Sequence, residues 1–322
     1  MDSKHHADDK GVAVVIAALL MFVILTTLLS AYVLWYVPTN GAQNDITYNQ
    51  EALNSLLQLQ GEVSSPNLQV GGYISQEMPM GTAGSPPFSS STDSFINMVN
   101  DTIFKALMQY SVLVNVSAGA KEWSLSLINY SANGTGEIIV NPNSQYINPG
   151  IFIMQDNSII QYSPKGNYSS FLGNVPVSIV NNRNISLNAS VLSITGENSS
   201  FGTYGSSLIT LELIGQNAAS YYKNQSLTMP NGTAVTIKNI HLYSFNYTIR
   251  SSFASGWNAS MFSNYDPSGI INGSYSSGFY WNYSSFTFSY DPINEEFKVS
   301  IGHHVVMSSV NLVFKNTKLL SL

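Results

Sequence analysis

Residues 12–37 read VAVVIAALLMFVILTTLLSAYVLWYV and contain no charged side chain. As an α-helix this run is about 39 Å long, which exceeds the ~30 Å hydrocarbon core of a bilayer. Tyr32, Trp35 and Tyr36 gather near its second end, where an interfacial aromatic belt is expected. No other run in the chain approaches this length. The sequence therefore predicts a single transmembrane helix over 12–37.

The charges that flank this helix predict its orientation. Lys4 and Lys10 precede it, and the next lysine is Lys105. Because positive residues favour the cytoplasmic side, residues 1–11 are expected in the cytoplasm as a short leader and residues 65–322 outside the cell as a β-rich domain. The predicted localisation is the cell membrane, with one span.

The start of the apolar run resembles a known type of processing signal. The run is longer than the 7–15 apolar residues of an ordinary secretory signal, and no small-x-small cleavage site follows it. The junction Lys10-Gly11-Val12 instead resembles the class III signal cut by archaeal prepilin peptidases. That resemblance implies cleavage after Gly11, a retained helix starting at Val12, and a prepilin peptidase-like protease as a partner. Ile16 stands at mature position five, where many type IV pilins carry Glu, and an uncleaved signal anchor is the alternative.

Residues 38–64 predict a stalk helix that ends before Pro66. Apolar side chains recur there at helical spacing, with amides on the opposite side. The stripe comprises Ile46, Leu53, Leu56, Leu57 and Gln60, and Asn49 and Gln50 lie opposite it. Such a helix either continues the membrane helix or forms a juxtamembrane linker.

The order of segments after the membrane helix resembles archaeal pilin-like or flagellin-like membrane-anchored surface proteins. The apolar helix is followed by YVP (36–38), LLQL (56–59) and MPMGTAGSPPFSSSTDSF (78–95). Three later segments are also similar, namely YINPGIFIMQDNSIIQYSP (146–164), ISLNASVLSITGENSSFGTYGSS (185–207) and ASGWNASMF (254–262). The resemblance covers most of the chain and implies a cellular location and an architecture rather than an activity.

Short β-type runs separated by turn residues fill the chain beyond residue 110. They are 111–117, 123–130, 136–140, 150–155, 158–162, 175–180, 207–214, 235–249, 284–290 and 297–314. Asp156-Asn157 is expected to form a hairpin turn, and a few helical turns are expected over 95–110. The predicted fold class is mainly β: a transmembrane helix and a stalk helix, followed by an extracellular antiparallel β-sandwich.

Composition excludes several classes of function. Charged residues make up 9% of the chain, the net charge is −6, and cysteine is absent. The chain therefore lacks the basic face that nucleic-acid binding needs, as well as disulfides, thiolate zinc sites and cysteine nucleophiles. A polar surface built from amides and hydroxyls suits either an acidic medium or a coat of glycans, and both interpretations remain open.

Asn-X-Ser/Thr sequons occur fourteen times, whereas composition alone predicts roughly 7. All of them lie on the predicted outer side of the membrane, so several are expected to carry glycans. The candidate acceptors are Asn100, Asn115, Asn129, Asn133, Asn167, Asn184, Asn188, Asn198, Asn224, Asn231, Asn246, Asn258, Asn272 and Asn282.

The sequence offers little catalytic chemistry. It contains no P-loop, HExxH or GxSxG pattern, and neighbouring strand residues such as His303 and His304 point to opposite faces and rarely share a metal. We predict no catalytic residue, no metal and no cofactor. The aromatic side chains of Tyr280, Trp281 and Tyr283 are candidates for binding sugars.

The leading prediction is a pilin-like cell-surface glycoprotein with a structural or adhesive role, in contact with the membrane and with like subunits or other surface glycoproteins. The alternative is an anchored extracellular module that binds glycans or solutes. An extracellular hydrolase is the less favoured third reading.

Overall fold

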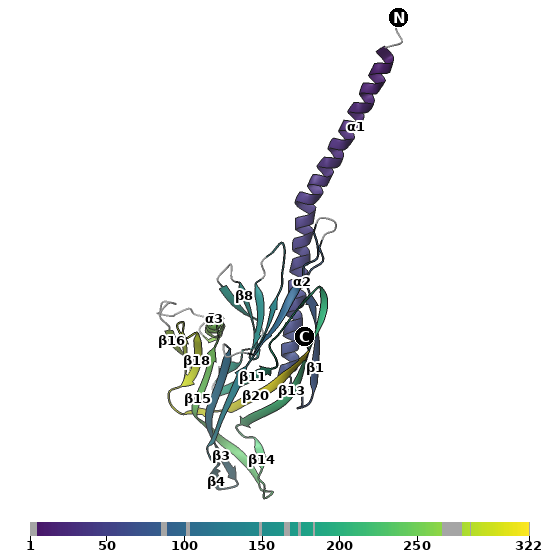
Figure 1. Cartoon of the computed structure of the whole chain (residues 1–322). Coiled ribbons are helices and arrows are strands. Elements are labelled where there is room, and N and C mark those ends of the chain that lie inside the picture. The colour runs from purple at the N-terminus through teal and green to yellow at the C-terminus, as the bar shows by residue number, and fades with distance from the viewer. Residues whose placement is uncertain are drawn as a thin grey trace.

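The computed structural model describes residues 5–84, 89–100, 104–147, 150–163, 168–172, 175–182, 184–265, 279–283 and 285–321. A long N-terminal helix enters a β-rich domain, and its first part stands clear of that domain (Figure 1). The chain is mainly β with one long apolar helix near its N-terminus, as the sequence predicts.

The N-terminal helix is continuous from His5 to Ser64. It consists of α1 (His5–Ala31), one π-helical turn η1 (Tyr32–Tyr36) and α2 (Val37–Ser64). Pro38 lies inside this helix, directly after the predicted transmembrane segment 12–37. Proline lacks an N–H group and its ring collides with the carbonyl group four residues earlier, here that of Leu34. The wider π turn just before Pro38 accommodates this defect without breaking the helix.

The first sheet has five strands in the order β1-β13-β20-β11-β10. Their bounds are β1 Tyr73–Met80, β13 Gly205–Tyr222, β20 Ser309–Ser321, β11 Asn184–Thr195 and β10 Val177–Asn182. β11 and β20 pair in parallel, whereas the sequence predicts antiparallel pairs. Every other described strand pair is antiparallel, as predicted.

The second sheet has six strands in the order β12-β2-β6-β7-β8-β9. Their bounds are β12 Ser199–Thr203, β2 Ser94–Val99, β6 Glu137–Asn141, β7 Ile151–Gln155, β8 Ser158–Ser163 and β9 Tyr168–Leu172. Asp156 and Asn157 form the turn between β7 and β8, which confirms the predicted hairpin. Asp156 has a φ of 51°, a left-handed conformation that Asp tolerates better than most residues.

The third sheet follows the order β16-β17-β18-β15-β3-β4, with β14 and β19 paired to β15 and β5 paired to β3. The bounds of its main strands are β16 Phe279–Tyr283, β17 Phe286–Asp291, β18 Glu296–Ile301, β15 Ala234–Arg250, β3 Lys105–Ala118 and β4 Lys121–Ser124. The added strands are β5 Ile128–Thr135, β14 Ser226–Thr228 and β19 Val305–Met307. Helix α3 (Ala254–Tyr265) follows β15 and packs on β9, β17 and β18.

The helical turns expected over 95–110 are absent from the part of this segment that the structure describes, where β2 and the start of β3 are found. Apolar residues there fit a period of two as well as the helical period. Ile96 and Met98 are buried on β2, and Ala106 and Met108 are buried on β3. Strand partners on both sides of each segment make the period of two the one that buries these side chains.

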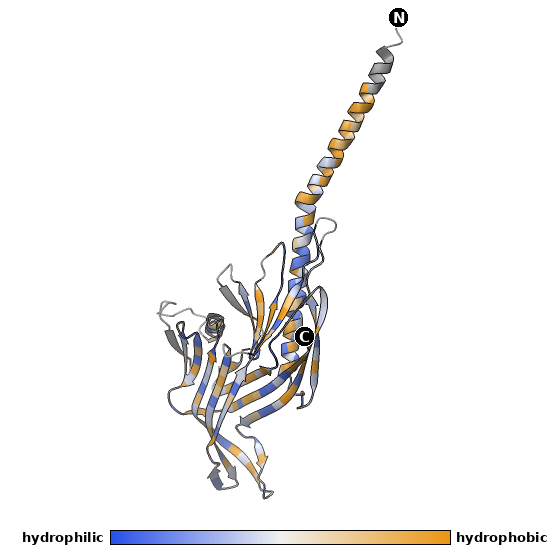
Figure 2. Cartoon of the chain, viewed as in Figure 1, coloured by the Kyte–Doolittle hydropathy of each residue, from blue (hydrophilic) through white to orange (hydrophobic). Residues whose placement is uncertain are grey.

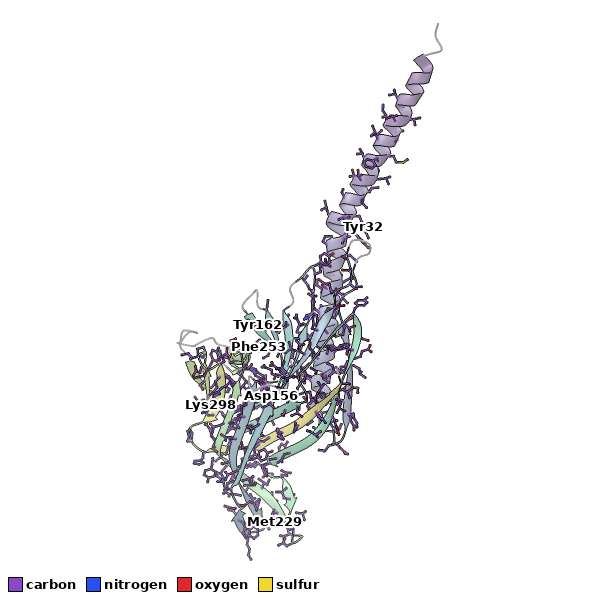
Figure 3. All side chains as sticks on the ribbon, in the orientation of Figure 1. Tyr32, Asp156, Tyr162, Met229, Phe253 and Lys298 are labelled. Atoms are coloured by element: carbon purple, nitrogen blue, oxygen red, sulfur yellow. The ribbon has the colours of Figure 1, made fainter. Side chains whose placement is uncertain are left out.

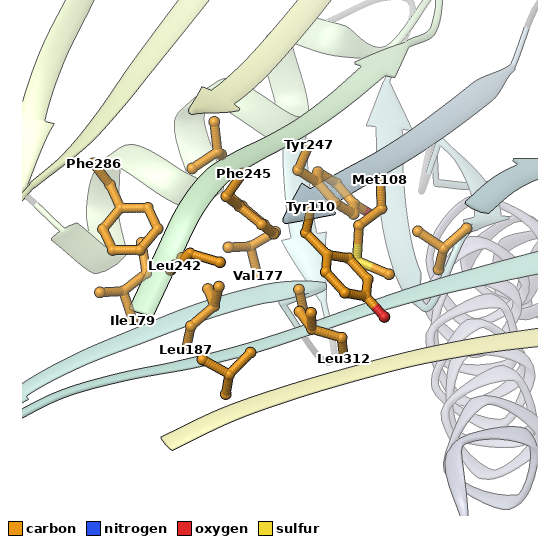
Figure 4. Close-up of a cluster of buried hydrophobic side chains, with 14 of the residues drawn as sticks. Met108, Tyr110, Val177, Ile179, Leu187, Leu242, Phe245, Tyr247, Phe286 and Leu312 are labelled. Carbon is orange, nitrogen blue, oxygen red and sulfur yellow. The ribbon is translucent and has the colours of Figure 1, made fainter. Parts of the chain in front are cut away.

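Two hydrophobic cores hold the domain together. The first lies between β3 and β15 of the third sheet and β10, β11 and β20 of the first sheet (Figure 4). The second joins α2, β1 and β13 to the inner side of the second sheet. A domain of this size gains most of its stability from such burial.

β11 contributes to both cores because its buried face changes along its length. Leu187 and Val191 point into the first core, whereas Leu192 and Ile194 point into the second. The parallel partner β20 behaves in the same way, with Leu312 in the first core and Leu319 in the second. The first sheet is therefore covered on opposite faces at its two ends, and Leu192 lies where the two cores meet.

Candidate functional site

The first feature that can carry a function is the uncovered part of the N-terminal helix. Its large apolar side chains are exposed on every side, including Val12 (58%), Phe22 (65%) and Leu34 (78%). Hydrophobic residues dominate this part of the helix (Figure 2). This helix is long and apolar enough to cross a membrane, by length and composition. Exposed apolar surface of this extent marks a contact with lipid or with another apolar surface.

The two threonine side chains of the uncovered helix bond to the helix itself. The Thr26 hydroxyl donates to the Phe22 carbonyl oxygen at 2.9 Å, and the Thr27 hydroxyl donates to the Val23 carbonyl oxygen at 2.7 Å. No hydroxyl donor of these two residues is left for water. This arrangement suits an apolar environment, where an unpaired donor is costly.

An aromatic group lies where the uncovered helix approaches the domain. The rings of Tyr32 and Tyr36 stack with centroids 4.9 Å apart, and Trp35 is 71% exposed. Figure 3 places Tyr32 on the helix, just above the β-rich domain. Side chains that are apolar along the ring and polar at the tip favour the boundary between hydrocarbon and water.

Below this group, polar side chains of α2 fix the helix to the domain. The Tyr48 hydroxyl donates to Ser94 Oγ at 2.6 Å, and burial raises the Tyr48 pKa. Asp45 Oδ2 accepts the backbone N–H groups of Tyr146 at 2.8 Å and Ile147 at 3.3 Å. These bonds connect α2 to segments 46 to 102 residues away, so the second part of the helix is joined firmly to the domain.

Two side chains of α2 lie on the opposite side from the one that the sequence suggested. Asn49 is buried and its Nδ2 donates to Ser144 Oγ at 3.2 Å, whereas Ile46 is 39% exposed. The domain supplies a hydrogen-bond partner for the buried amide, which the helical period cannot reveal. Gln60 is buried as predicted, through a bond to the Asn157 carbonyl oxygen.

Lys315 caps the C-terminus of α2. Its ammonium group donates to the carbonyl oxygens of Val63 at 2.7 Å and Ser65 at 2.6 Å. Carbonyl groups at a helix C-terminus lack helical partners and carry a partial negative charge, so a cation there is favourable. Burial lowers the pKa of Lys315.

The turn between β7 and β8 connects α2 with all three sheets. Asn157 accepts hydrogen bonds from Gln60 and Ser64 of α2, each at 2.5 Å. Asp156 Oδ1 accepts the Leu192 N–H of β11 at 2.5 Å, and Asp156 Oδ2 accepts the hydroxyl of Tyr247 on β15. Figure 3 places Asp156 near the middle of the domain. A two-residue turn thus contacts the helix and one strand from each of the other two sheets.

Asp156 is fully buried, and burial raises its pKa to about 7. The hydrogen bonds from Tyr247 and Leu192 oppose this effect only in part. Burial also raises the pKa of Tyr247 well above its ordinary value. Asp156 and Tyr247 share a proton in the closed interior of the domain. Their protonation can respond to pH, but neither side chain is accessible to a substrate.

A second buried polar group lies beside this pair. Gln155 Nε2 donates to a Glu137 carboxylate oxygen, and Gln155 Oε1 accepts from Ser251 Oγ at 2.9 Å and Trp257 Nε1 at 3.2 Å. Gln155 and Trp257 have no exposed surface. This group connects β6 and β7 to the start of α3 and serves the packing of the fold.

The residues predicted for processing lie within α1. Lys10, Gly11 and Val12 are helical, and the Val12 side chain is exposed. The helix continues without a break past this position, and cleavage after Gly11 stays a prediction.

The structure exposes many of the predicted glycan acceptors. Asn100, Asn129, Asn133, Asn188, Asn198, Asn224 and Asn231 are exposed, and Asn115 and Asn246 are half-buried. Asn258 on α3 is buried and 2% exposed, so the folded chain does not present it. Asn167 and Asn272 lie outside the described residues, as do the side chains of Asn184 and Asn282.

The predicted binding aromatics fall on one strand. Tyr280, Trp281 and Tyr283 belong to β16, opposite Ser289, Phe288 and Phe286 of β17. Their side chains lie outside the described part of the structure. The backbone alone places them at the edge of the third sheet.

His303 and His304 lie in the turn between β18 and β19, and both are exposed. The expectation of one strand face each is therefore wrong, because the chain turns at this point. The described residues contain no group of three or more His, Asp or Glu side chains arranged to hold a metal.

Comparisons of the chain with known protein families, with curated proteins and with solved structures find no match. Local sequence patterns do not reveal that Asp156, Tyr247 and Lys315 join separate elements, because their partners lie far away in sequence. The only related signal in the sequence is the predicted Asp156-Asn157 turn.

Proposed function

We propose that this chain is a pilin-like cell-surface protein whose N-terminal helix lies in the membrane or in the core of a filament, while its β-rich domain faces outward. One observation carries the proposal. A helix that is apolar on every side passes without a break into a second part that is bonded into the domain. A structural or adhesive role suits such a molecule, because its apolar helix holds the β-rich domain in a defined position at the surface.

The domain suits the outer side of a cell. We describe it as sandwich-like, since residues of β10, β11 and β20 share one core with residues of β3 and β15. One ion pair, Arg250–Glu296 at 3.0 Å, is found among the described residues. Amides and hydroxyls supply most of the remaining polar surface, and this chemistry changes little with acid or salt.

N-terminal sequencing of the protein purified from its native cells tests the proposal. We expect a start at Val12 and co-purification with fibres sheared from the cell surface. A start at Met1, or at a residue beyond Pro38, contradicts the pilin-like processing.

A pair of glycine variants sharpens this experiment. Gly11→Val alters the residue before the expected cut and should leave the leader attached and the fibres absent. Gly61→Ala is the control, because Gly61 lies on the exposed side of α2 with nothing within 4 Å of an added Cβ atom. If both variants give sheared fibres in equal amounts, filament assembly by this route is wrong.

A shallow groove favours the second candidate, an anchored module that binds glycans or solutes. This groove of about 450 Å³ crosses β15, β3 and β5. Its outer lining is uncharged and polar: Gln109, Ser111, Asn129, Ser131, Ser244 and Asn246. Neutral saccharides offer hydroxyl groups to such a lining. Titration of the full chain in detergent with a panel of neutral oligosaccharides tests this candidate, with Ser131→Arg and Ser244→Arg as blocking variants.

A further inference from the structure

Three aromatic rings gather on the outer face of the third sheet, away from both cores. We call His241, Tyr243 and His304 the ring cluster. The rings of Tyr243 and His304 stack with centroids 5.7 Å apart and an angle of 24°, and the His241 ring lies 6.2 Å from that of His304. Tyr243 is 49% exposed. The ring cluster therefore offers an aromatic surface to the solvent.

Tyr243 lies on the outer face of β15, at a bulge. The pairing between β15 and β3 shifts between Leu242 and Ser244, so Tyr243 is an extra residue on its strand. Leu242 points into the first core, so the alternation of the strand places Tyr243 on the outer face, and after the bulge Phe245 points into the core again. Bulges are common beside functional sites.

Asn115 of β3 lies directly beside the ring cluster. Its Nδ2 is 3.3 Å from Nε2 of His241, and its Oδ1 accepts from Ser124 Oγ at 2.7 Å. Asn115-Val116-Ser117 is one of the sequons of the chain. The sequon nitrogen thus sits at the edge of the exposed rings.

We infer that Asn115 carries an N-linked glycan whose first sugars pack on the ring cluster. This inference rests on the outward orientation of the domain in the proposed function. A pyranose ring has an apolar face of C–H groups, which packs on aromatic rings, and hydroxyl groups at its rim, which bond to amides and imidazoles. The ring cluster with its flanking Asn115 and Ser124 provides both kinds of contact and carries no carboxylate.

The modification is a transfer from a lipid-phosphate-linked oligosaccharide. Nδ2 of Asn115 forms a bond to the anomeric carbon of the sugar. The bond from that carbon to the phosphate oxygen breaks with its electron pair, and the amide proton leaves with the lipid phosphate. The product amide keeps one N–H for Nε2 of His241, and its oxygen still accepts from Ser124. Both hydrogen bonds around Asn115 therefore survive glycosylation.

Digestion with trypsin isolates Asn115 on a peptide that contains no other sequon. Cleavage after Lys105 and Lys121 gives the peptide 106–121, in which Asn115 is the sole sequon. Mass spectrometry of the full chain from its native cells should show this peptide carrying a glycan. Recovery of mainly unmodified 106–121, alongside a glycosylated peptide containing Asn133, would overturn the inference.

Contact with the rings needs a second measurement. In protein from the native cells, Asn115→Gln should lower the melting temperature by about 2 °C. We expect a smaller drop when Asn115→Gln is made in the Tyr243→Ser/His304→Ser background. The drop should then equal the one that Asn115→Gln causes in protein made in cells that do not glycosylate. Tyr73→Ser, which removes a 64% exposed tyrosine from β1, is the matched control and should leave the loss unchanged.

An equal loss in all backgrounds would show that the glycan does not touch the ring cluster. The absence of glycans at every sequon would also overturn the inference, but a start at Val12 and sheared fibres would still be observed if the proposed function holds. The two proposals therefore fail separately.

Discussion

Asp156 occupies an unusual position for a carboxyl group. It lies in a turn, with a left-handed backbone, and yet it has no exposed surface. Its two oxygens accept the Leu192 N–H and the Tyr247 hydroxyl, and the ion pair that the structure describes does not involve it. Without a cation beside it, the neutral form of this group is the favoured one in the folded chain.

The stability of the protein should therefore fall as the pH rises from about 4 to 7. Asp156 has a pKa of about 7 in the folded chain against an ordinary 3.8, so the native state binds a proton that the unfolded state releases across this window. The stabilisation is complete below about pH 4 and is lost above about pH 7, with a total on the order of 4 kcal/mol. Urea unfolding measured at several pH values checks this.

Asp156→Asn should remove most of this dependence, because Asn keeps the acceptor and tolerates the left-handed backbone. Asp291→Asn is the control. Asp291 is half-buried in a surface turn, and its bonds to Asn294 lower its pKa, so its contribution has the opposite sign. A steep fall between pH 4 and 7 that persists in Asp156→Asn would assign the effect to another group. A confirmed fall would favour the acidic medium among the two readings of the low charge content.

Lys315→Met should destabilise the folded chain by about 2–4 kcal/mol. The substitution leaves two carbonyl groups at the end of α2 without their donor, and loss of a buried group's partner costs about 1–3 kcal/mol, more where a charged donor is removed. Lys318→Met, three residues along the same strand and exposed, should change stability by less than about 0.5 kcal/mol. Chemical denaturation of both variants distinguishes the loss of the hydrogen bonds at the C-terminus of α2 from the general effect of removing a positive charge.

At the scale of elements, the docking of α2 depends on one close approach. A Cβ atom on Gly41 would overlap the ring of Tyr146, which packs against the helix there. Gly41→Ala should therefore destabilise the protein by about 1–3 kcal/mol, even though Ala is the better helix former. Thermal unfolding measures this, and Tyr146→Ala should rescue the variant.

Gly61 provides the opposite case on the same helix. Nothing lies within 4 Å of an added Cβ atom, so Gly61→Ala should stabilise the chain by about 1 kcal/mol through helix propensity alone. Equal effects of the two substitutions would mean that Tyr146 does not pack on α2 in solution.

Sequence patterns predicted most strands because burial follows a simple alternation. Ile209, Leu211 and Leu213 of β13 are buried while Leu208 on the same strand is exposed, as the period of two requires. The same reasoning failed over 95–110, where the spacing of apolar residues fits both periods. It also missed α3, whose sequence ASGWNASMFSNY is rich in residues that favour turns.

The joining residues were beyond reach of such patterns. Tyr247 lies 91 positions from Asp156, and Lys315 lies 252 positions from Val63. A local pattern indicates that a polar residue is exposed, and only the tertiary fold supplies the partner that allows its burial. The same holds for Asn49, whose partner Ser144 comes from another segment.

At the scale of the whole molecule, the uncovered helix and the domain should respond separately to mutation. Leu20→Lys places a charge on the uncovered helix, where the side chain is 58% exposed, and should move the protein from the membrane or fibre fraction to the soluble fraction. Cell fractionation measures this. The unfolding midpoint of the domain should stay the same, since Leu20 contacts none of its cores.

Ile293→Lys is the matched control for this variant. Ile293 is 87% exposed on a turn of the domain, so the same change in charge and polarity there should leave the fractionation unaltered. Retention of Leu20→Lys in the membrane or fibre fraction would show that the domain, rather than the helix, holds the protein in place.

The unbroken passage from α1 through η1 into α2 fixes the rotational phase of the domain about the helix axis. Each residue inserted into or deleted from an α-helix turns everything beyond it by about 100° and shifts it by about 1.5 Å. The π turn at Tyr32–Tyr36 has already made one such adjustment, because it holds more residues than an α turn. Which side of the domain faces a neighbour, and which faces open medium, is thus set by how many residues this chain places between Val12 and Pro38.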